Sequence, residues 1–210
     1  MIKKNPMPQV ERRATIVDSS VELRMHGEGT MPTLIGYAAV FNSRTDLGWF
    51  EEEIVPGAFT QSMTDGDDVR ALYNHDSAQV IGRRSAKTLR LEEDATGLRI
   101  EIDLPDTTSA RDLIANITAG NIDGMSFGFR AREQEWIERE GQPELRRITN
   151  AELIEVSAVT FPAYPDTSIA QRSLELSRNE SPAGHSASEE RNQTPTPSLQ
   201  VLRLRAARLK

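Results

Sequence analysis

Three side chains far apart in the sequence are of the types needed for a hydrolytic relay: Ser126, His75 and Glu155. A serine hydroxyl is a weak nucleophile until a base takes its proton, and histidine suits that task because its pKa lies near neutrality. The base in turn needs an acceptor on its other ring nitrogen, which a carboxylate can supply. The sequence therefore contains the groups for nucleophilic hydrolysis, provided that the fold brings them together.

Only one of the three histidines follows a predicted strand. His75 comes just after the strand expected at residues 69–73, whereas His26 lies in a Gly-rich polar stretch and His185 in a segment with almost no large apolar side chains. A single histidine in such a place is more often structural than catalytic. If the protein uses a histidine base, however, that base is His75.

Ser126 lies in a strand whose alternate side chains differ in polarity. Met125, Phe127 and Phe129 are expected to face a core, so Ser126 and Gly128 face the other way. Gly128 would leave open space beside the Ser126 hydroxyl, where a peptide backbone could approach. The alternatives are an ordinary half-buried strand with Ser126 on its solvent side, and a bulge at Gly128.

Glu155 lies within an apolar run, at residues 153–161, where a carboxylate is costly to bury without a partner. A hydrogen-bonded histidine is a suitable partner; the alternative is an edge strand that leaves Glu155 in water. Asp76 competes for the role of the acid because it adjoins His75, although adjacent strand residues point to opposite faces. Ser157 shares a face with Glu155 and is a competing nucleophile, which we rank as a supporting hydrogen-bond partner.

The composition excludes several other classes of function. The chain has 210 residues, no cysteine and a formal net charge of −7. Disulfides, thiolate zinc sites and cysteine nucleophiles are therefore excluded, and a general nucleic-acid binder is disfavoured. No apolar run near the N-terminus predicts a signal peptide or a membrane span. There is no phosphate-binding loop, and the aspartates between 65 and 68 suit a solvated loop, so we expect neither a metal nor another cofactor.

Strands are the main elements that would position the candidate residues. Two short ones at 10–17 and 21–25 could form a hairpin. The turn at 93–97 ends in Gly97, where a positive φ costs little. Apolar and alternating runs predict the longer strands at 34–41, 69–73, 88–91, 98–104, 124–131 and 153–161.

Two helices interrupt these strands. One is expected near 58–63 and the other at 109–119, capped by Thr107 or Thr108 and ended by Gly120. The sequence thus predicts a mainly β fold with a few α-helices, arranged as a mostly antiparallel sheet or barrel.

The composition also divides the chain into segments. Residues 1–31 are a polar lead-in, and residues 32–174 hold nearly all the strong structural signals. Residues 175–198 lack the apolar surface needed to offset ordering and are interpreted as a disordered linker. Residues 199–210 return to Leu and Arg, either as a basic amphipathic tail with a docking role or as a frayed end.

Eight short motifs, each weak alone, resemble the prohead serine protease family of tailed phages by their order and spacing over residues 32–170. They are Gly36–Asn42, Glu53–Phe59, Leu72–Asp76, Ile81–Arg83, Gly97–Leu98, Leu104–Thr107, Gly124–Phe129 and Glu155–Pro165. That family looks related to the herpesvirus assembly proteases, whose fold is a closed antiparallel β-barrel surrounded by helices. In those enzymes the third catalytic member is a second histidine, and the resemblance places Glu155 at that position here.

The resemblance implies a serine endopeptidase with Ser126 as nucleophile, His75 as general base and Glu155 as orienting acid. It would act in the host cytoplasm, inside the assembling procapsid, during virion maturation. Its substrates would be the scaffold or the scaffold-like arm of the major capsid protein, and the protease itself. The segment 175–198 would be accessible to self-cleavage, and the tail would deliver the enzyme to the shell. No nucleic acid or membrane is implied as a partner, and a homo-oligomer stays open.

An oxyanion hole needs backbone N–H donors. The turn after Pro162, which itself has no N–H, could supply them from Ala163 or Tyr164. Two other functions stay open as alternatives. One is a proteolytically inactive scaffold or assembly protein with the same fold. The other is an acid–base hydrolase that uses two carboxylates, such as Glu155 with Asp103.

Overall fold

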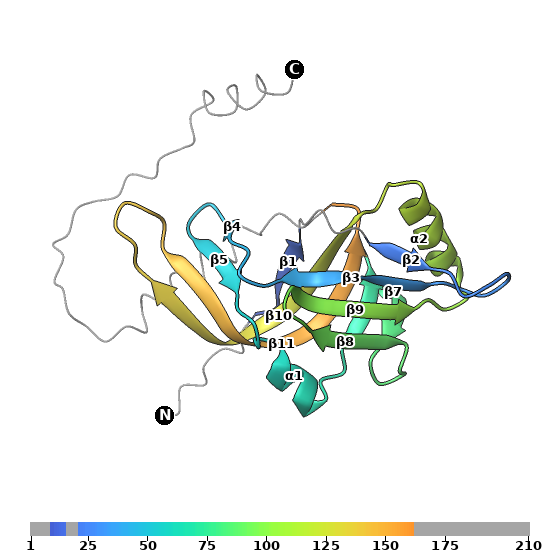
Figure 1. Cartoon of the computed structure of the whole chain (residues 1–210), viewed down its shortest axis with the longest axis horizontal. Coiled ribbons are helices and arrows are strands. Elements are labelled where there is room, and N and C mark those ends of the chain that lie inside the picture. The colour runs from blue at the N-terminus through green and yellow to red at the C-terminus, as the bar shows by residue number, and fades with distance from the viewer. Residues whose placement is uncertain (1–8, 16–20, 162–210) are drawn as a thin grey trace, which may run out of the picture. The chain divides into compact units, whose positions relative to one another are not determined.

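The computed structural model describes residues 9–15 and 21–161, all within one compact unit (Figure 1). Eleven described strands form two sheets, and two helices flank them. The first sheet contains β1 (Glu11–Thr15), β4 (Thr45–Asp46), β5 (Glu51–Ile54), β6 (Arg70–Tyr73), β7 (Asp76–Arg83), β10 (Gly124–Ile137) and β11 (Leu145–Val159). The second contains β2 (Glu22–Arg24), β3 (Thr33–Val40), β8 (Leu89–Glu93) and β9 (Gly97–Asp103). The helices are α1 (Thr60–Asp65) and α2 (Thr108–Thr118).

The expectation of a closed antiparallel β-barrel is wrong, because both sheets are open. The seven-stranded sheet runs β1-β10-β11-β5-β4, with β6 and β7 attached to β11, and the four-stranded sheet runs β2-β3-β9-β8. Closure requires every edge strand to find a neighbour. The far edge of β11 is instead divided between two parallel neighbours, β5 along Leu145 to Ile148 and β6 along Glu155 to Ala158. In the described residues the fold is mainly β with two helices, but it is not a barrel.

Apolar side chains between the sheets form one core. Met125, Phe127 and Phe129 of β10 belong to this core as predicted, although Ser126 between them is buried as well. The Phe127 ring stacks on Phe129 at 5.3 Å and meets Phe59 edge-on at 5.6 Å, measured between ring centroids. The four-stranded sheet contributes its own apolar face, including Leu34. The sheets therefore join through packed side chains rather than through a backbone ladder.

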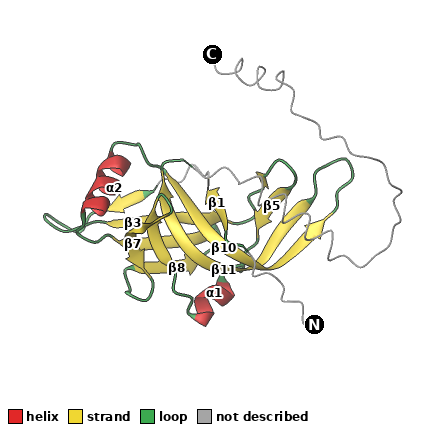
Figure 2. Ribbon diagram, turned by 180° about the vertical axis from the view of Figure 1, so that it is seen from behind, coloured by secondary structure: helices red, strands yellow, loops and turns green. Residues whose placement is uncertain are grey.

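The long hairpin of β10 and β11 reaches beyond the four-stranded sheet, with β4 and β5 beside its distal half (Figures 1 and 2). The two short N-terminal strands exist as predicted, but they do not form a hairpin. β1 pairs with β10 in one sheet and β2 pairs with β3 in the other. Each short strand thus extends a different sheet.

Several local predictions can be compared with the backbone. Thr107 caps α2 by accepting a hydrogen bond from the backbone N–H of Ala110, and Gly120 follows the helix with a φ of 73°. Gly97 is required for another reason than the one expected. Its φ is not positive, but a Cβ there would lie 2.0 Å from the carbonyl oxygen of Ala39. Glycine at this turn therefore permits a close backbone approach.

No helix in the described ranges is long and apolar enough to span a membrane. The linker predicted at 175–198 and the tail predicted at 199–210 lie outside the described residues. The linker and the tail therefore stay predictions.

Candidate active site

A two-residue turn places His75 beside β11. Tyr73 and Asp76 are paired residues of β6 and β7, so Asn74 and His75 form the whole loop. Both have positive φ, 51° and 60°, as a type I′ hairpin requires, and both residue types tolerate this region better than most. The backbone N–H of Asn74 donates to the carbonyl of Ala158 at 2.9 Å, which anchors the turn to β11.

Glu155 is buried on β11 and accepts hydrogen bonds from three side chains. The His75 Nδ1 atom lies 2.6 Å from Glu155 Oε1, and the Ser157 hydroxyl donates to Oε2 at 2.5 Å. Arg12 Nε donates to Oε1 at 3.3 Å. Burial alone would raise the pKa of Glu155, but these hydrogen bonds, with that of His75 the largest, bring its pKa below the ordinary value. The Glu155 carboxylate is therefore ionised at neutral pH.

Gly128 makes room for the Glu155 carboxylate. The two residues face each other across the β10–β11 ladder, and a Cβ on Gly128 would lie 2.9 Å from Glu155 Oε1. The space expected above Gly128 for a peptide backbone is thus occupied by Glu155. A side chain at position 128 would push the carboxylate away from His75.

Ser126 lies on the same face of the sheet as this cluster, but its hydroxyl points elsewhere. It is directly opposite Ser157 on β11 and Ala14 on β1, and residues opposed in a ladder share a face. The Ser126 Oγ donates to the carbonyl oxygen of Arg13 at 2.8 Å. The side chain is fully buried rather than half-buried, because β1 covers it.

The second ring nitrogen of His75 makes no hydrogen bond within the described residues. This nitrogen, Nε2, is buried. The structure therefore brings His75, Glu155 and Ser157 into contact. It places Ser126 in the adjacent strand without a hydrogen bond to the imidazole.

The residues considered as alternative acids make hydrogen bonds elsewhere. Asp76 accepts hydrogen bonds from the backbone N–H of Ala78 and from Gln79, both in its own strand. Asp103, considered as a partner carboxylate for Glu155, belongs to the four-stranded sheet and is held by Arg90 and Thr33. The sequence-predicted oxyanion donors Ala163 and Tyr164 lie outside the described residues.

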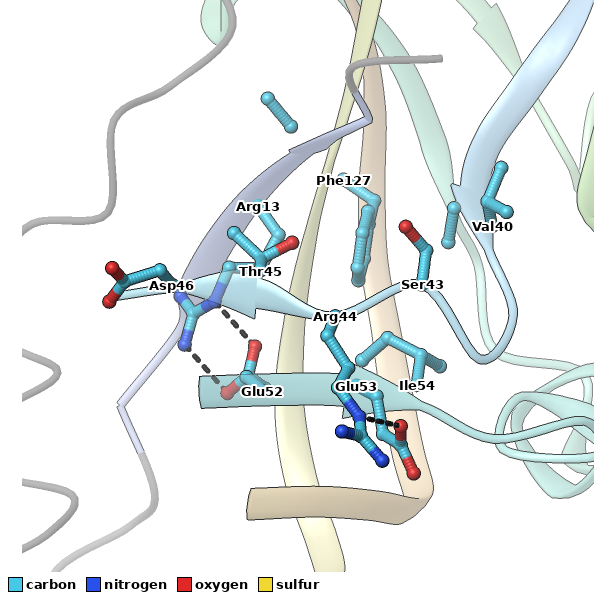
Figure 3. Close-up of a pocket in the computed structure, with 12 residues that line it drawn as sticks. Arg13, Val40, Ser43, Arg44, Thr45, Asp46, Glu52, Glu53, Ile54 and Phe127 are labelled. Atoms are coloured by element: carbon cyan, nitrogen blue, oxygen red, sulfur yellow. Dashed lines mark hydrogen bonds and ion pairs between the residues drawn. The ribbon is translucent and has the colours of Figure 1, made fainter. Parts of the chain in front are cut away.

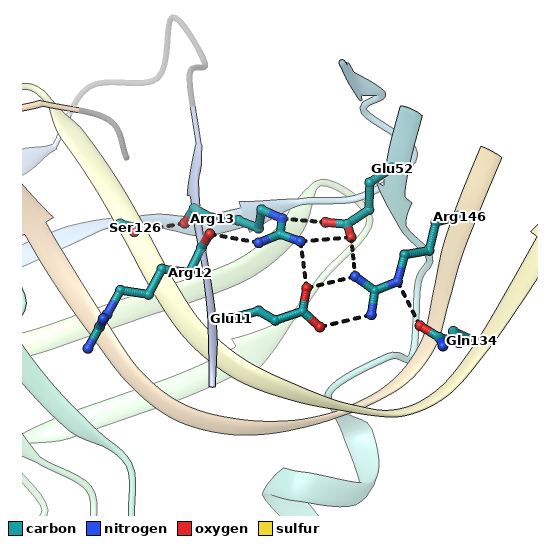
Figure 4. Close-up of polar contacts among 7 residues, drawn as sticks. All are labelled: Glu11, Arg12, Arg13, Glu52, Ser126, Gln134 and Arg146. Atoms are coloured by element: carbon teal, nitrogen blue, oxygen red, sulfur yellow. Dashed lines mark hydrogen bonds and ion pairs between the residues drawn. The ribbon is translucent and has the colours of Figure 1, made fainter. Parts of the chain in front are cut away.

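A buried cluster of four charges adjoins the site, and the sequence analysis missed it. Arg13 donates to Glu52 at 2.6 and 3.0 Å and to Glu11 at 2.7 Å (Figure 4). Arg146 donates to Glu11 at 2.7 and 2.8 Å and to Glu52 at 2.8 Å. Burial would lower the pKa of Arg13, but Glu52 and Glu11 raise it above its ordinary value. Runs such as Glu11-Arg12-Arg13 resemble a solvated face, so only the pairing of distant strands could have revealed the cluster.

A cavity of about 310 Å³ opens on the other face of β10, beside Phe127 and the Arg13 side chain (Figure 3). Its lining carries side chains of both charges. Asp46, Glu52 and Glu53 contribute carboxylates, and Arg44 is paired with Glu53. The cavity thus adjoins the ion pair of Arg13 with Glu52.

Two comparisons with known proteins indicate one family, and a third shows a similar fold. The family model described as caudovirus prohead serine protease matches residues 19–180. The prohead protease of Enterobacteria phage HK97 is 30% identical over 168 residues, which cover 78% of this chain and 69% of that protein. The solved structure of the bacteriophage T4 capsid assembly protease has a similar fold. Its TM-score is 0.50 at 13% identity, covering 73% of this chain and 99% of that one. The matched family segment begins after β1.

Proposed function

The chain belongs to the caudovirus prohead serine protease family, and we propose that it cleaves peptide bonds with Ser126 as nucleophile, His75 as general base and Glu155 as orienting acid. Family membership makes the protein a protease of phage capsid maturation. The observation that supports the residue roles is the 2.6 Å contact between His75 Nδ1 and Glu155 Oε1, with Nε2 buried and without a hydrogen-bond partner among the described residues.

The proposed reaction follows from this contact. Glu155 holds the proton on Nδ1, so the lone pair of Nε2 is available to accept the Ser126 proton. The freed oxygen attacks the substrate carbonyl carbon, and Glu155 stabilises the imidazolium that forms. The imidazolium then gives its proton to the leaving amine as the C–N bond breaks. Water hydrolyses the resulting ester by the same steps, which regenerates the serine hydroxyl.

The reaction would also need a group that orients Glu155 and donors that stabilise the oxyanion. Ser157 donates to the second carboxylate oxygen of Glu155, which limits rotation of that carboxylate. The developing oxyanion needs backbone N–H donors, for which Ala163 and Tyr164 remain our candidates. We expect the substrates to be the scaffold or the scaffold-like arm of the major capsid protein, and the protease itself, within the procapsid.

The test is processing in the presence of the capsid protein. Ser126→Ala and His75→Ala should each reduce cleavage by at least about 10⁴-fold while the fold is preserved. Ser77→Ala, an exposed serine close to the His75 turn, is the matched control and should process normally. Intact-mass measurement of the protease and its substrate reads out both reactions. Full processing by Ser126→Ala would exclude this residue as nucleophile.

A second candidate is the inactive assembly protein, and one observation favours it. The Ser126 hydroxyl is bonded to Arg13 rather than to His75. A wild-type chain that stays full length and leaves capsid protein uncut in assembled procapsids would favour this candidate. A reversible block of Ser126 by β1 accounts for the same hydrogen bond without loss of activity.

A further inference from the structure

We propose that the edge of β10 beside Ser126 is the substrate-binding edge, and that β1 is bound there in place of a substrate strand. A substrate would then bind as an extended antiparallel strand with a basic residue at the position of Arg13. This inference rests on the proposed role of Ser126. It adds to that role the substrate class and the means by which the site is kept closed.

The first argument is the position of β1. It is the outermost strand of its sheet and pairs with β10 from Glu11 opposite Phe129 to Thr15 opposite Met125, so that its ladder spans Ser126. Without β1 this stretch of β10 would present free backbone donors and acceptors. An extended peptide binds such an edge by adding a strand.

The second argument is the contact at the nucleophile. Any peptide bound in the register of β1 presents the carbonyl of its Arg13 equivalent to Ser126 Oγ, now at 2.8 Å from the Arg13 oxygen. In β1 the hydroxyl donates its proton to that oxygen rather than to His75, so attack on a substrate in the same register requires the hydroxyl to turn toward His75 Nε2 first. Arg12 meanwhile donates to Glu155. β1 therefore contacts both the proposed nucleophile and the proposed acid.

The third argument is the charge balance of the buried cluster. Its four charges divide into two neutral halves: Glu11 and Arg13 belong to β1, whereas Glu52 and Arg146 belong to the body of the sheet. If β1 leaves, the contact between Glu52 and Arg146 at 2.8 Å remains. Removing a single charge from a buried pair is strongly unfavourable, but removing a neutral half avoids that penalty. The cluster thus suits a strand that can be exchanged.

The same contacts indicate the substrate sequence. The Glu52 carboxylate favours a basic side chain at the residue whose carbonyl faces Ser126. Arg146, which contacts both carboxylate oxygens of Glu11, favours an acidic side chain two residues earlier. We therefore expect cleavage after the basic residue of an acidic–any–basic sequence. Water adds across the C–N bond, leaving a carboxylate on the basic residue and an amine on the next.

The experiment measures cleavage in trans of a synthetic peptide with the sequence of residues 9–20, QVERRATIVDSS. The enzyme is the full chain as wild type and as Glu11→Gln/Arg13→Gln, which weakens β1 docking without changing net charge. We expect the variant to cut the peptide between its Arg13 and Ala14 equivalents with a kcat/KM at least 10-fold above wild type. A peptide with Glu in place of its Arg13 equivalent should be cut at least 100-fold more slowly.

Asp106→Asn/Arg111→Gln, an exposed pair at α2, is the charge-matched control and should behave as wild type. A second altered protein keeps the test valid if the first variant misfolds. A site for a sequence-specific protease is inserted between Thr15 and Val21, and the folded full chain is then cut there. Cutting should raise peptide cleavage at least 10-fold, and adding excess peptide of residues 9–15 should reverse the rise.

The outcomes separate this inference from the proposed function. If capsid protein is cut in a Ser126-dependent manner but both altered forms cleave the peptide no faster than wild type, the substrate-edge assignment is overturned. Equal cleavage of the Arg and Glu peptides would overturn the basic preference. If instead every form, including Ser126→Ala, processes capsid protein alike, it is the role of Ser126 that fails.

Discussion

At the scale of single residues, the site depends on how closely Glu155 can approach His75. The carboxylate reaches the imidazole over a position that has no side chain, since Gly128 lies opposite it. A glycine in the middle of a strand usually weakens it. Here the missing Cβ has a specific use, because it leaves room for a buried acid.

Gly128→Ala should therefore impair catalysis more than stability. The new Cβ would displace the Glu155 carboxylate, and a misplacement of about 1 Å can cost about 10²-fold in kcat/KM. Gly124→Ala is the matched control in the same strand, because its Cβ would find its nearest neighbour at 3.7 Å. Wild-type kcat/KM in Gly128→Ala would show that the carboxylate position is unimportant. Partial rescue by the shorter Glu155→Asp would support the displacement.

Glu155→Gln tests the charge of the acid without changing its shape. The amide can donate to Nδ1, which favours the tautomer with a proton on Nε2, and a loss of about 10⁴ in kcat is expected. Because the pKa of Glu155 lies below the ordinary range, the wild-type carboxylate should stay ionised across the pH range of activity. A pH–rate profile of both forms, with capsid protein as substrate, checks this. A Gln variant within 10-fold of wild type would contradict the assigned role.

The residue types of the site were predictable from the sequence, but their contacts were not. The Met125, Phe127 and Phe129 alternation placed Ser126 on the opposite face of its strand, and that held because the pattern has a fixed period of two. Which strand covers that face is a question of pairing between distant segments. β1 covers Ser126, and nothing in its short, charged sequence predicts that it pairs with β10.

At the scale of elements, β1 should be sensitive to acid. Burial raises the pKa of Glu11, but hydrogen bonds and charges from Arg146 and Arg13 bring it below its ordinary value in the folded chain. A carboxyl with a lowered folded pKa adds stability above its unfolded pKa, and that contribution is lost as pH falls through the folded pKa. Docking of β1 should therefore weaken below the ordinary carboxyl range.

Urea unfolding at pH 7 and at pH 3, with NMR of the β1 backbone amides, measures this effect. The wild type should lose more unfolding free energy over this range than Glu11→Gln/Arg13→Gln, in which the titrating group is absent. Equal losses in the two proteins would mean that Glu11 does not link β1 docking to pH.

Closure of the sheet was the element-scale prediction that failed. Strand patterns identify which segments are strands, but closure depends on which edges meet, and a pattern of period two does not encode that. β11 is long enough for two parallel neighbours on one edge, and the apolar faces of both sheets are satisfied by packing against each other. The short strands β4 and β5 are rich in acid and contain a single apolar residue, Ile54, too little for a strand pattern.

At the scale of the whole molecule, Arg146 connects the distal hairpin with the N-terminal strand. It lies on β11, contacts β1 through Glu11 and β5 through Glu52, and donates a hydrogen bond to Gln134 on β10. Arg146→Met would leave two buried carboxylates with a single cation. The expected loss of unfolding free energy is about 3–5 kcal/mol.

Denaturant unfolding measures this loss, and Arg90→Met is the control. Arg90 pairs with Asp103 and Glu101 on the surface, where such pairs contribute about 0–1 kcal/mol. Adding Glu52→Gln to Arg146→Met should recover part of the loss, because it removes the excess negative charge. A double variant less stable than the single one would contradict the charge-balance explanation.

The covalent link between β1 and the rest of the chain has one more consequence. Covalent attachment through a short segment of chain gives a ligand an effective concentration in the millimolar range. Only residues 16–20 join β1 to Val21, so a free peptide at dilute levels would rarely displace it. Inside a closed shell crowded with substrate, the competitor reaches a comparable concentration. Enclosure itself would then switch the enzyme on by mass action, with no separate activator.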